Sequence, residues 1–219
     1  MVTFDMIRSN EEIRTYIAKG NQNLDVLGFT EHAFGHAMKA ADTAAKILTA
    51  LGHGERDVEL AKMAGFMHDL GNCINRTDHA HTGALMAMNI LRDMGMDPKE
   101  IAVIIAAIGN HDEKTGTAVD AVSAALILAD KTDVRRSRVR GRDKTGFDIH
   151  DRVNYAAISS ELDIDKEEKV ITLSVELDDT MCSVLDYFEI FLSRMVMCRR
   201  AAEMLGCAFK MRANGAKVL

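Results

Sequence analysis

The fold of this chain is predicted most clearly by the stretch AGFMHDLGN, residues 64–72. Its first half continues an amphipathic pattern that predicts a helix over about 55–69. The helix is expected to end near Gly71, because glycine commonly follows the last turn of a helix. His68 and Asp69 therefore stand side by side at the end of an apolar helix, an arrangement that rarely arises by accident.

Similar patterns predict five further helices in the first two thirds of the chain. The clearest start is Asp97-Pro98, which combines a capping residue with proline at the first helical position. A capping box from Ser9 to Glu12 and a cap at Thr30 mark two other starts. The predicted helices cover about 9–27, 30–51, 80–94, 97–109 and 119–131.

Histidine and aspartate recur at the ends of these helices, where the helices of a bundle can converge. His32 and His36 lie four residues apart and share one helix face. Imidazole and carboxylate groups together suit zinc, iron, manganese or nickel. Each residue alone is more often a hydrogen-bonded core or capping residue, but their recurrence favours a metal site. The candidates are His32, His36, His68, Asp69, His79, His81, His111, Asp112 and Asp130.

The motifs around these candidates resemble the HD-domain superfamily of metal-dependent phosphohydrolases over about residues 25–135. The family order is a histidine, a His-Asp pair and a distal aspartate, matched here by His36, His68-Asp69 and Asp130. Two further histidines mark the binuclear branch of the family, and His79 and His111 match them. His81 is the alternative to His79, although it fits the family spacing to Gly83-Ala84 less well.

This resemblance implies two divalent transition metals, drawn from iron, manganese, zinc, nickel or cobalt. His36, His68 and Asp130 would hold the first metal, His79 and His111 would hold the second, and Asp69 would bridge them. Such a centre lowers the pKa of bound water to about 7 and supplies hydroxide at neutral pH. The predicted catalytic residues are Asp69 and Asp112. Asp112 would orient His111 or the water; the alternative is a solvated loop acid.

One departure from the family pattern matters, and one branch of the family lacks support. Many members carry lysine three residues after the aspartate of the His-Asp pair, whereas this chain has Asn72. Positive charge near the leaving phosphate would then come from Lys131 or from an arginine. The chain also has no Gly-Tyr-Pro segment, so the branch that acts on cyclic-di-GMP is not supported.

A basic segment follows the last predicted ligand, within residues 132–150 of an otherwise acidic chain. One guanidinium group can bind two phosphate oxygens at once. A segment with several arginines therefore predicts a substrate with more than one phosphate, such as a nucleotide. The alternative is a solvated loop that pairs with acids of a neighbouring subunit. His32 would either donate to a phosphate or support a metal ligand. The predicted substrate-binding residues are His32, Lys131, Arg135, Arg136, Arg138 and Arg140.

The residue pattern changes in the last third of the chain, which is predicted to form a small second unit. Strands are expected at Asn154–Asp163 and Lys169–Leu177, where apolar and polar residues alternate, followed by a helix at Met181–Leu205 and a strand at Phe209–Leu219. The fold class is therefore mainly α: an HD-domain helical bundle over 1–146, then a small α+β unit over 147–219 with antiparallel β-β-α-β order. The exposed sheet edges and the apolar helix predict a homodimer; the alternative is that the helix packs only on its own sheet. The helix residues concerned are Tyr187, Phe188, Ile190, Phe191, Met195 and Met197.

Composition narrows the functional class. The 219 residues carry a net charge of −6, which disfavours a general nucleic-acid binder. No run of 18 uncharged apolar residues and no secretory signal pattern are present, so neither a membrane span nor export is expected. The four cysteines lack CxxC spacing and are expected to be reduced thiols in the cytoplasm, mostly in the core.

The sequence therefore predicts a cytoplasmic metal-dependent phosphohydrolase that acts on a small phosphorylated molecule, with a nucleotide preferred. A di-iron oxygenase of the same superfamily is one alternative, distinguished by its metal and by an oxygen requirement. A regulatory nucleotide-binding module, in which the metal only anchors the ligand, is the other. The complete ligand set argues against such a module, because degenerate modules usually lose ligands.

Overall fold

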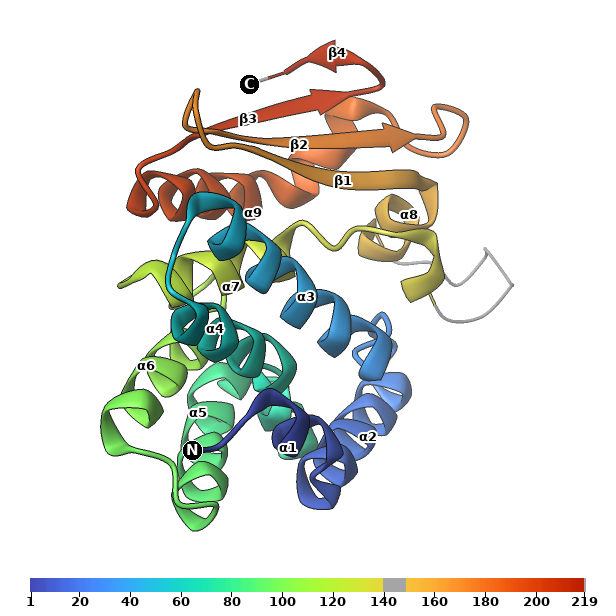
Figure 1. Ribbon diagram of the computed structural model, residues 1–219. Helices are drawn as coiled ribbons and strands as arrows, with labels where there is room; N and C mark the ends of the chain where they lie inside the picture. The colour runs from blue at the N-terminus through green and yellow to red at the C-terminus, as the bar shows by residue number, and fades with distance from the viewer. Residues whose placement is uncertain (140–148, 219) are drawn as a thin grey trace.

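The computed structural model describes residues 1–139 and 149–218 as a helical bundle with a sheet at one end (Figure 1). The bundle contains α1 (Phe4–Ser9), α2 (Glu11–Val26), α3 (Phe34–Leu51), α4 (Glu55–Met67), α5 (His79–Asp93), α6 (Pro98–Gly109) and α7 (Ala121–Lys131). Short 3₁₀ turns, η1 (Leu70–Cys73) and η2 (Arg136–Arg138), follow α4 and α7. The rest comprises α8 (Ile149–Ala156), β1 (Ala157–Asp165), β2 (Val170–Leu177), α9 (Val184–Met204), β3 (Ala208–Ala213) and β4 (Ala216–Lys217).

Local capping explains several helix boundaries. Asp97 accepts a hydrogen bond from the Lys99 amide at the start of α6, with Pro98 at the first helical position, as predicted. Asp120 and Ser123 form a reciprocal capping box at the start of α7. α3 ends at Gly52, whose φ of 84° lies in the left-handed region that glycine adopts easily.

Two predicted helix starts are wrong. Asn10, not Ser9, caps α2, because Ser9 ends the short helix α1 and its hydroxyl donates to the Asp5 carbonyl. α3 begins at Phe34 rather than after Thr30. The segment before it is irregular and is held by partners outside it, since the Glu31 amide donates to the Arg138 carbonyl and the His32 amide to Asn21 Oδ1. These tertiary bonds override the local capping preference.

The sheet has the order β1-β2-β3-β4. The first pair is antiparallel, but β3 runs parallel to β2, so the predicted antiparallel arrangement is wrong for this strand. The reason is α9, which returns the chain to the same end of the sheet as a crossover helix. The first strand begins at Ala157, because Asn154 still belongs to α8. The predicted last strand is divided into β3 and β4 by a tight turn at Asn214-Gly215, both with positive φ.

One continuous apolar core joins the bundle to the sheet. α9 packs on α7 on one side and on β3 on the other, as Figure 1 shows. The predicted domain boundary at 146/147 lies outside the described residues. Four of the helix residues taken as a dimer surface are instead buried within the chain, which is the alternative noted above: Tyr187, Phe191, Met195 and Met197.

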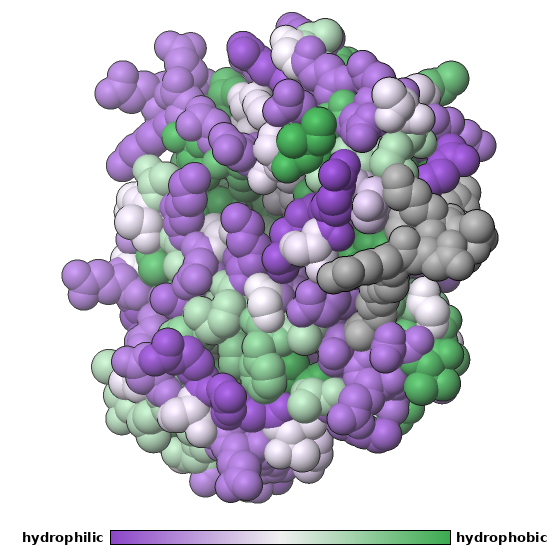
Figure 2. Space-filling view, turned by 90° about the vertical axis from the view of Figure 1, so that its right-hand side faces the viewer, coloured by the Kyte–Doolittle hydropathy of each residue, from purple (hydrophilic) through white to green (hydrophobic). Residues whose placement is uncertain are grey.

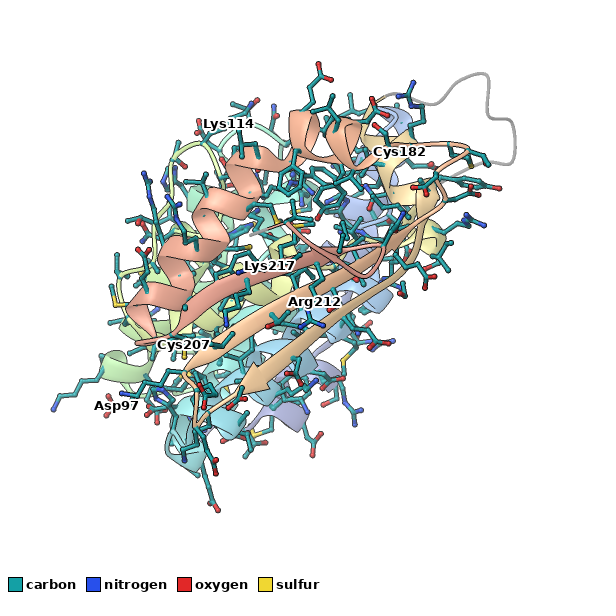
Figure 3. All side chains as sticks on the ribbon, turned by 90° about the horizontal axis from the view of Figure 1, so that it is seen from above. Asp97, Lys114, Cys182, Cys207, Arg212 and Lys217 are labelled. Atoms are coloured by element: carbon teal, nitrogen blue, oxygen red, sulfur yellow. The ribbon has the colours of Figure 1, made fainter. Side chains whose placement is uncertain are left out.

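Polar side chains cover the exposed side of strand β3 and much of one face of the molecule. Side chains alternate along β3, so that Phe209 and Met211 are buried while Lys210 and Arg212 are exposed; Figure 3 labels Arg212 on this sheet. On the face drawn in Figure 2, hydrophilic side chains prevail and apolar ones form separate patches.

The cysteines are free thiols, three of them buried. Within the described ranges, the helices lack the length and apolar content needed to cross a membrane.

Candidate metal centre

Five ends of helices converge on one buried point in the bundle. They bring together His36 from the first turn of α3, His68-Asp69 from the end of α4, His79 from the start of α5, His111 from just after α6 and Asp130 from the last turn of α7. The four histidines are at most 4% exposed. The sequence thus identified side chains that the fold gathers into one cluster.

The first group consists of His36, His68 and Asp130. The Nε2 atoms of the two histidines are 3.2 Å apart, and Asp130 Oδ1 lies 3.2 Å from His36 Nε2 and 3.7 Å from His68 Nε2. The three ligand atoms all fall within 4.8 Å of one another. That spacing is suitable for one ion bound at about 2.0–2.2 Å from each atom.

The second group lies directly beside the first. His79 Nε2 and His111 Nε2 are 3.2 Å apart, and the ligand atoms of His68, Asp69 and His111 lie within 4.8 Å of one another. Asp69 stands between the groups, with Oδ2 3.3 Å from His68 Nε2 and Oδ1 3.6 Å from His79 Nε2. The two oxygens of this carboxylate therefore face different histidines, Oδ2 facing His68 and Oδ1 facing His79.

The hydrogen bonds behind the histidines define which nitrogen faces the centre. The Nδ1 atoms of His68, His79 and His111 are 2.6–3.0 Å from the carbonyls of Gly65, Arg76 and Ile108, and His36 Nδ1 is 2.8 Å from Asp133 Oδ2. These acceptors require a proton on each Nδ1, so the inferred tautomers aim unprotonated Nε2 lone pairs inward.

The donor set fits divalent metal ions. Paired Nε2 lone pairs 3.2 Å apart repel each other unless a cation lies between them. Within the part of the chain that the structure describes, Asp69 Oδ2 is buried and has no hydrogen-bond partner. A buried carboxylate oxygen without a partner is costly, and metal coordination would satisfy it.

The electrostatics of the centre shift the pKa values of its side chains in both directions. Although burial opposes its charge, Asp69 and Asp130 raise the pKa of His68. Burial lowers the pKa of His79 and, further, that of His111, so both imidazoles are neutral near pH 7. Although burial opposes its charge, the Lys131 ammonium, 2.7 Å from Oδ2, helps hold the pKa of Asp130 well below its ordinary value. The pKa of Asp69 is likewise held well below its usual range, against burial, chiefly by His68.

Several predicted residues lie in or beside a cavity of about 540 Å³ that opens onto this centre. His32, Asp112, Lys131 and Arg138 line it. The His32 ring lies against that of His36, with centroids 5.4 Å apart. His81 points away, more than half exposed beside Asp78, so His79 is the histidine that joins the cluster.

The arginines predicted to bind substrate do not all reach the cavity. Arg138 lines the cavity, whereas Arg135 Nε is bound to Asp133, and Arg136 Nε donates to the Tyr155 carbonyl outside the cavity. Arg140 lies outside the described residues. Lys131 also contacts Asp130 directly, which places its charge beside a ligand.

Sequence reasoning missed four residues near the centre. Arg76, Lys114 and Arg194 line the cavity, and Asp133 lies behind His36. Figure 3 labels Lys114 beside α9, the helix that also carries Arg194. The spacing of Asp133 three residues after Asp130 was a usable signal, but Arg194 is remote in sequence and gave none.

At the position where many HD-domain proteins have lysine, Asn72 serves another purpose. Its side-chain amide donates to Asp69 Oδ1 over 2.7 Å. The positive charge comes instead from Arg76, whose Nη1 atom is 3.6 Å from the same oxygen. Asn72 and Arg76 therefore orient the central carboxylate together.

The helix ends of the bundle converge on a buried cluster of histidine and aspartate side chains. This arrangement is typical of helical proteins that bind metal ions. Residues 33–170, more than half of the chain, match the HD domain family. The chain therefore belongs to the HD domain family, whose members bind divalent metals.

Sequence identity to individual proteins is low. An uncharacterized protein of Methanocaldococcus jannaschii is 26% identical over 200 residues, covering 80% of this chain and 76% of its own length. Ribonuclease Y of Opitutus terrae is 28% identical over 54% of this chain, and ribonuclease Y of Thermosipho melanesiensis is 24% identical over 73%. The matches span only 21% and 31% of these two ribonucleases.

Among solved structures, the chain is similar to a predicted HD superfamily hydrolase from an uncultured Thermotogales bacterium. The identity is 24%, the TM-score is 0.45, and the match covers 57% of this chain and 67% of the other.

Proposed function

We propose that this protein is a metal-dependent phosphohydrolase that cleaves a phosphate ester or anhydride bond of a small molecule, with a nucleotide as the preferred substrate. The observation that carries the proposal is the position of Asp69, whose Oδ2 faces His68 and whose Oδ1 faces His79, at a cavity lined with arginines. Membership of the HD domain family and similarity to proteins named ribonuclease Y support hydrolysis of phosphate esters.

The residues would divide the work as follows. His36, His68 and Asp130 would hold one divalent metal, His79 and His111 a second, and Asp69 both. When bound, the metals supply Lewis acidity that activates water and neutralises phosphate charge. Asp112, on the cavity wall, orients His111 or the attacking water through its carboxylate. Arg138 and Arg194 donate to phosphate oxygens.

The cavity supports a nucleotide-sized substrate. Its volume of about 540 Å³ lies within the usual range for small-molecule sites. Arg138 and Arg194 contribute cations to its lining, while Leu27 and Phe29 contribute apolar surface that suits a flat base. The phosphates and the base of a nucleotide would therefore both find complementary groups around the centre. A cytoplasmic location and a homodimer are further parts of this proposal, and light scattering would test the dimer.

We expect about two equivalents of divalent transition metal per chain in protein purified without chelator, because two histidine pairs share one carboxylate. Elemental analysis by mass spectrometry measures this directly, and it also identifies iron, manganese, zinc, nickel or cobalt. A fully active preparation that holds a single equivalent would show that His79 and His111 serve the substrate instead.

Arg194→Gln should lower kcat/KM about ten- to a hundredfold while the metal content stays normal. The reason is the loss of a charge-assisted hydrogen bond to phosphate, worth roughly 1.5–3 kcal/mol. Arg194→Lys should recover only part of the loss, because lysine lacks the two-pronged donor geometry. Steady-state kinetics on the best substrate provide the measurement.

Arg199→Gln is the matched control on the same helix, since its side chain is 57% exposed and pairs with Glu203. It should retain kinetics within about twofold of the wild type, as should Arg136→Gln. Equal effects of Arg194→Gln and Arg199→Gln would remove Arg194 from substrate recognition.

The decisive experiment is a screen of metal-loaded protein against nucleoside mono-, di- and triphosphates, dinucleotides and simple phosphate esters, with and without oxygen. Release of inorganic phosphate or nucleotide without oxygen supports the proposal. Turnover only with oxygen and iron would identify the oxygenase instead. Nucleotide binding without turnover would identify a regulatory module.

A further inference from the structure

Asp133 is a buried carboxylate that the proposed reaction does not use. It lies two residues beyond the end of α7, three residues after Asp130, and is 5% exposed. Its Oδ2 is 2.8 Å from His36 Nδ1, and its Oδ1 accepts from Arg135 Nε over 2.8 Å. Arg138 Nη1 lies 3.8 Å from Oδ2 and donates to the Asp133 carbonyl. A buried charge with this many partners is held in one orientation.

This contact distinguishes His36 from the other three histidines of the centre. His68, His79 and His111 place Nδ1 against backbone carbonyls, whereas His36 places it against a carboxylate. A carboxylate is the stronger acceptor, so it fixes the imidazole ring and makes the opposite nitrogen a better donor to a metal.

The two half-sites consequently differ in charge. Around His36 and His68 lie Asp69 Oδ2, Asp130 and, behind the ring, Asp133. The side of His79 and His111 faces Asp69 Oδ1, an oxygen already engaged by Asn72 at 2.7 Å and by Arg76 at 3.6 Å. More carboxylates therefore lie around the first pair, although Lys131 pairs with Asp130, and Arg135 pairs with Asp133.

We propose that Asp133 is a positioning residue that makes the half-site of His36 the tighter of the two, so that the metals bind in sequence, first at His36/His68 and then at His79/His111. This inference rests on the proposed metal centre. Its consequence is that the second metal exchanges more easily than the first.

Asp133→Asn tests this role by titrating the metal-free full chain with Zn²⁺ in a calorimeter. The wild type should show two binding steps of unequal affinity. The variant should lose ten- to a hundredfold in the tight step, the usual effect of removing the partner of a metal-binding histidine, and change little in the weak step. The loss should appear in zinc affinity whether or not a substrate is known.

Asp120→Ala is the structural control, because Asp120 caps α7 but lies at the opposite end of the helix from Asp130. It should lower stability while both zinc affinities stay unchanged. Equal zinc affinities in Asp133→Asn and the wild type would overturn the positioning role while leaving the metal centre intact. A wild type that binds no zinc would overturn both.

A second measurement uses the wild type alone, in case Asp133→Asn does not fold. In zinc-loaded protein, the ring Nδ1 proton of His36 should resonate at lower field than those of His68, His79 and His111, because its hydrogen bond to a carboxylate is stronger. Proton–nitrogen correlation spectra of the histidine rings detect these signals. A His36 proton within the range of the other three would contradict the inference.

Discussion

Asp69→Asn should reduce kcat/KM by about 10³-fold or more, equivalent to about 4 kcal/mol of transition-state stabilisation. The carboxylate lies between His68 and His79, and its replacement by a neutral amide removes the charge that two adjacent cations would share. Metal content should fall to one equivalent or fewer. Elemental analysis and kinetics on the same preparation measure both effects.

The matched control is Asp93→Asn, at the end of α5, where the side chain is 75% exposed. This variant should keep both metal and activity within about twofold of the wild type. If Asp69→Asn kept two metals and most of the activity, the carboxylate would not be the bridge, and the proposed function would lose the observation on which it depends.

Gly71→Ala should destabilise the protein by about 3 kcal/mol or more, a large value for one methyl group. A Cβ at this position would collide with the His79 carbonyl and lie 2.7 Å from the Gly83 amide nitrogen. These are backbone atoms of α5, so no side chain can move aside. For a chain of this size, the melting temperature should fall by roughly 6–12 °C in a thermal unfolding measurement.

The same substitution should also affect the second histidine pair. A methyl group that displaces the His79 backbone moves its ring away from His111, so the variant should retain the tighter metal and lose the other. Gly109→Ala is the control, because its nearest neighbour would be Ala84 Cβ at an ordinary 3.7 Å. It should be neutral or stabilising. Similar stability of the two variants would mean that α5 does not pack rigidly against η1.

Local patterns were sufficient for much of the fold. The start of α6 followed from Asp97-Pro98, and the alternation over Val170–Leu177 predicted β2, because caps and side-chain periodicity act within a few residues. The start of α3 did not follow from Thr30, since hydrogen bonds to Asn21 and Arg138 hold the preceding backbone outside the helix. The direction of β3 depended on the path of α9, which no local pattern specifies.

The same distinction between local sequence patterns and tertiary contacts holds for the candidate site. The sequence by itself determined the kinds and order of the residues that meet at the centre, because histidine and aspartate at the ends of apolar helices stand out in one dimension. The tertiary structure alone decided that Arg138 rather than Arg136 reaches the cavity, that Arg194 lines it, and that Asp133 lies behind His36. In irregular segments the direction of a side chain has no period, and the partners that orient it come from remote elements whose packing only the folded chain establishes.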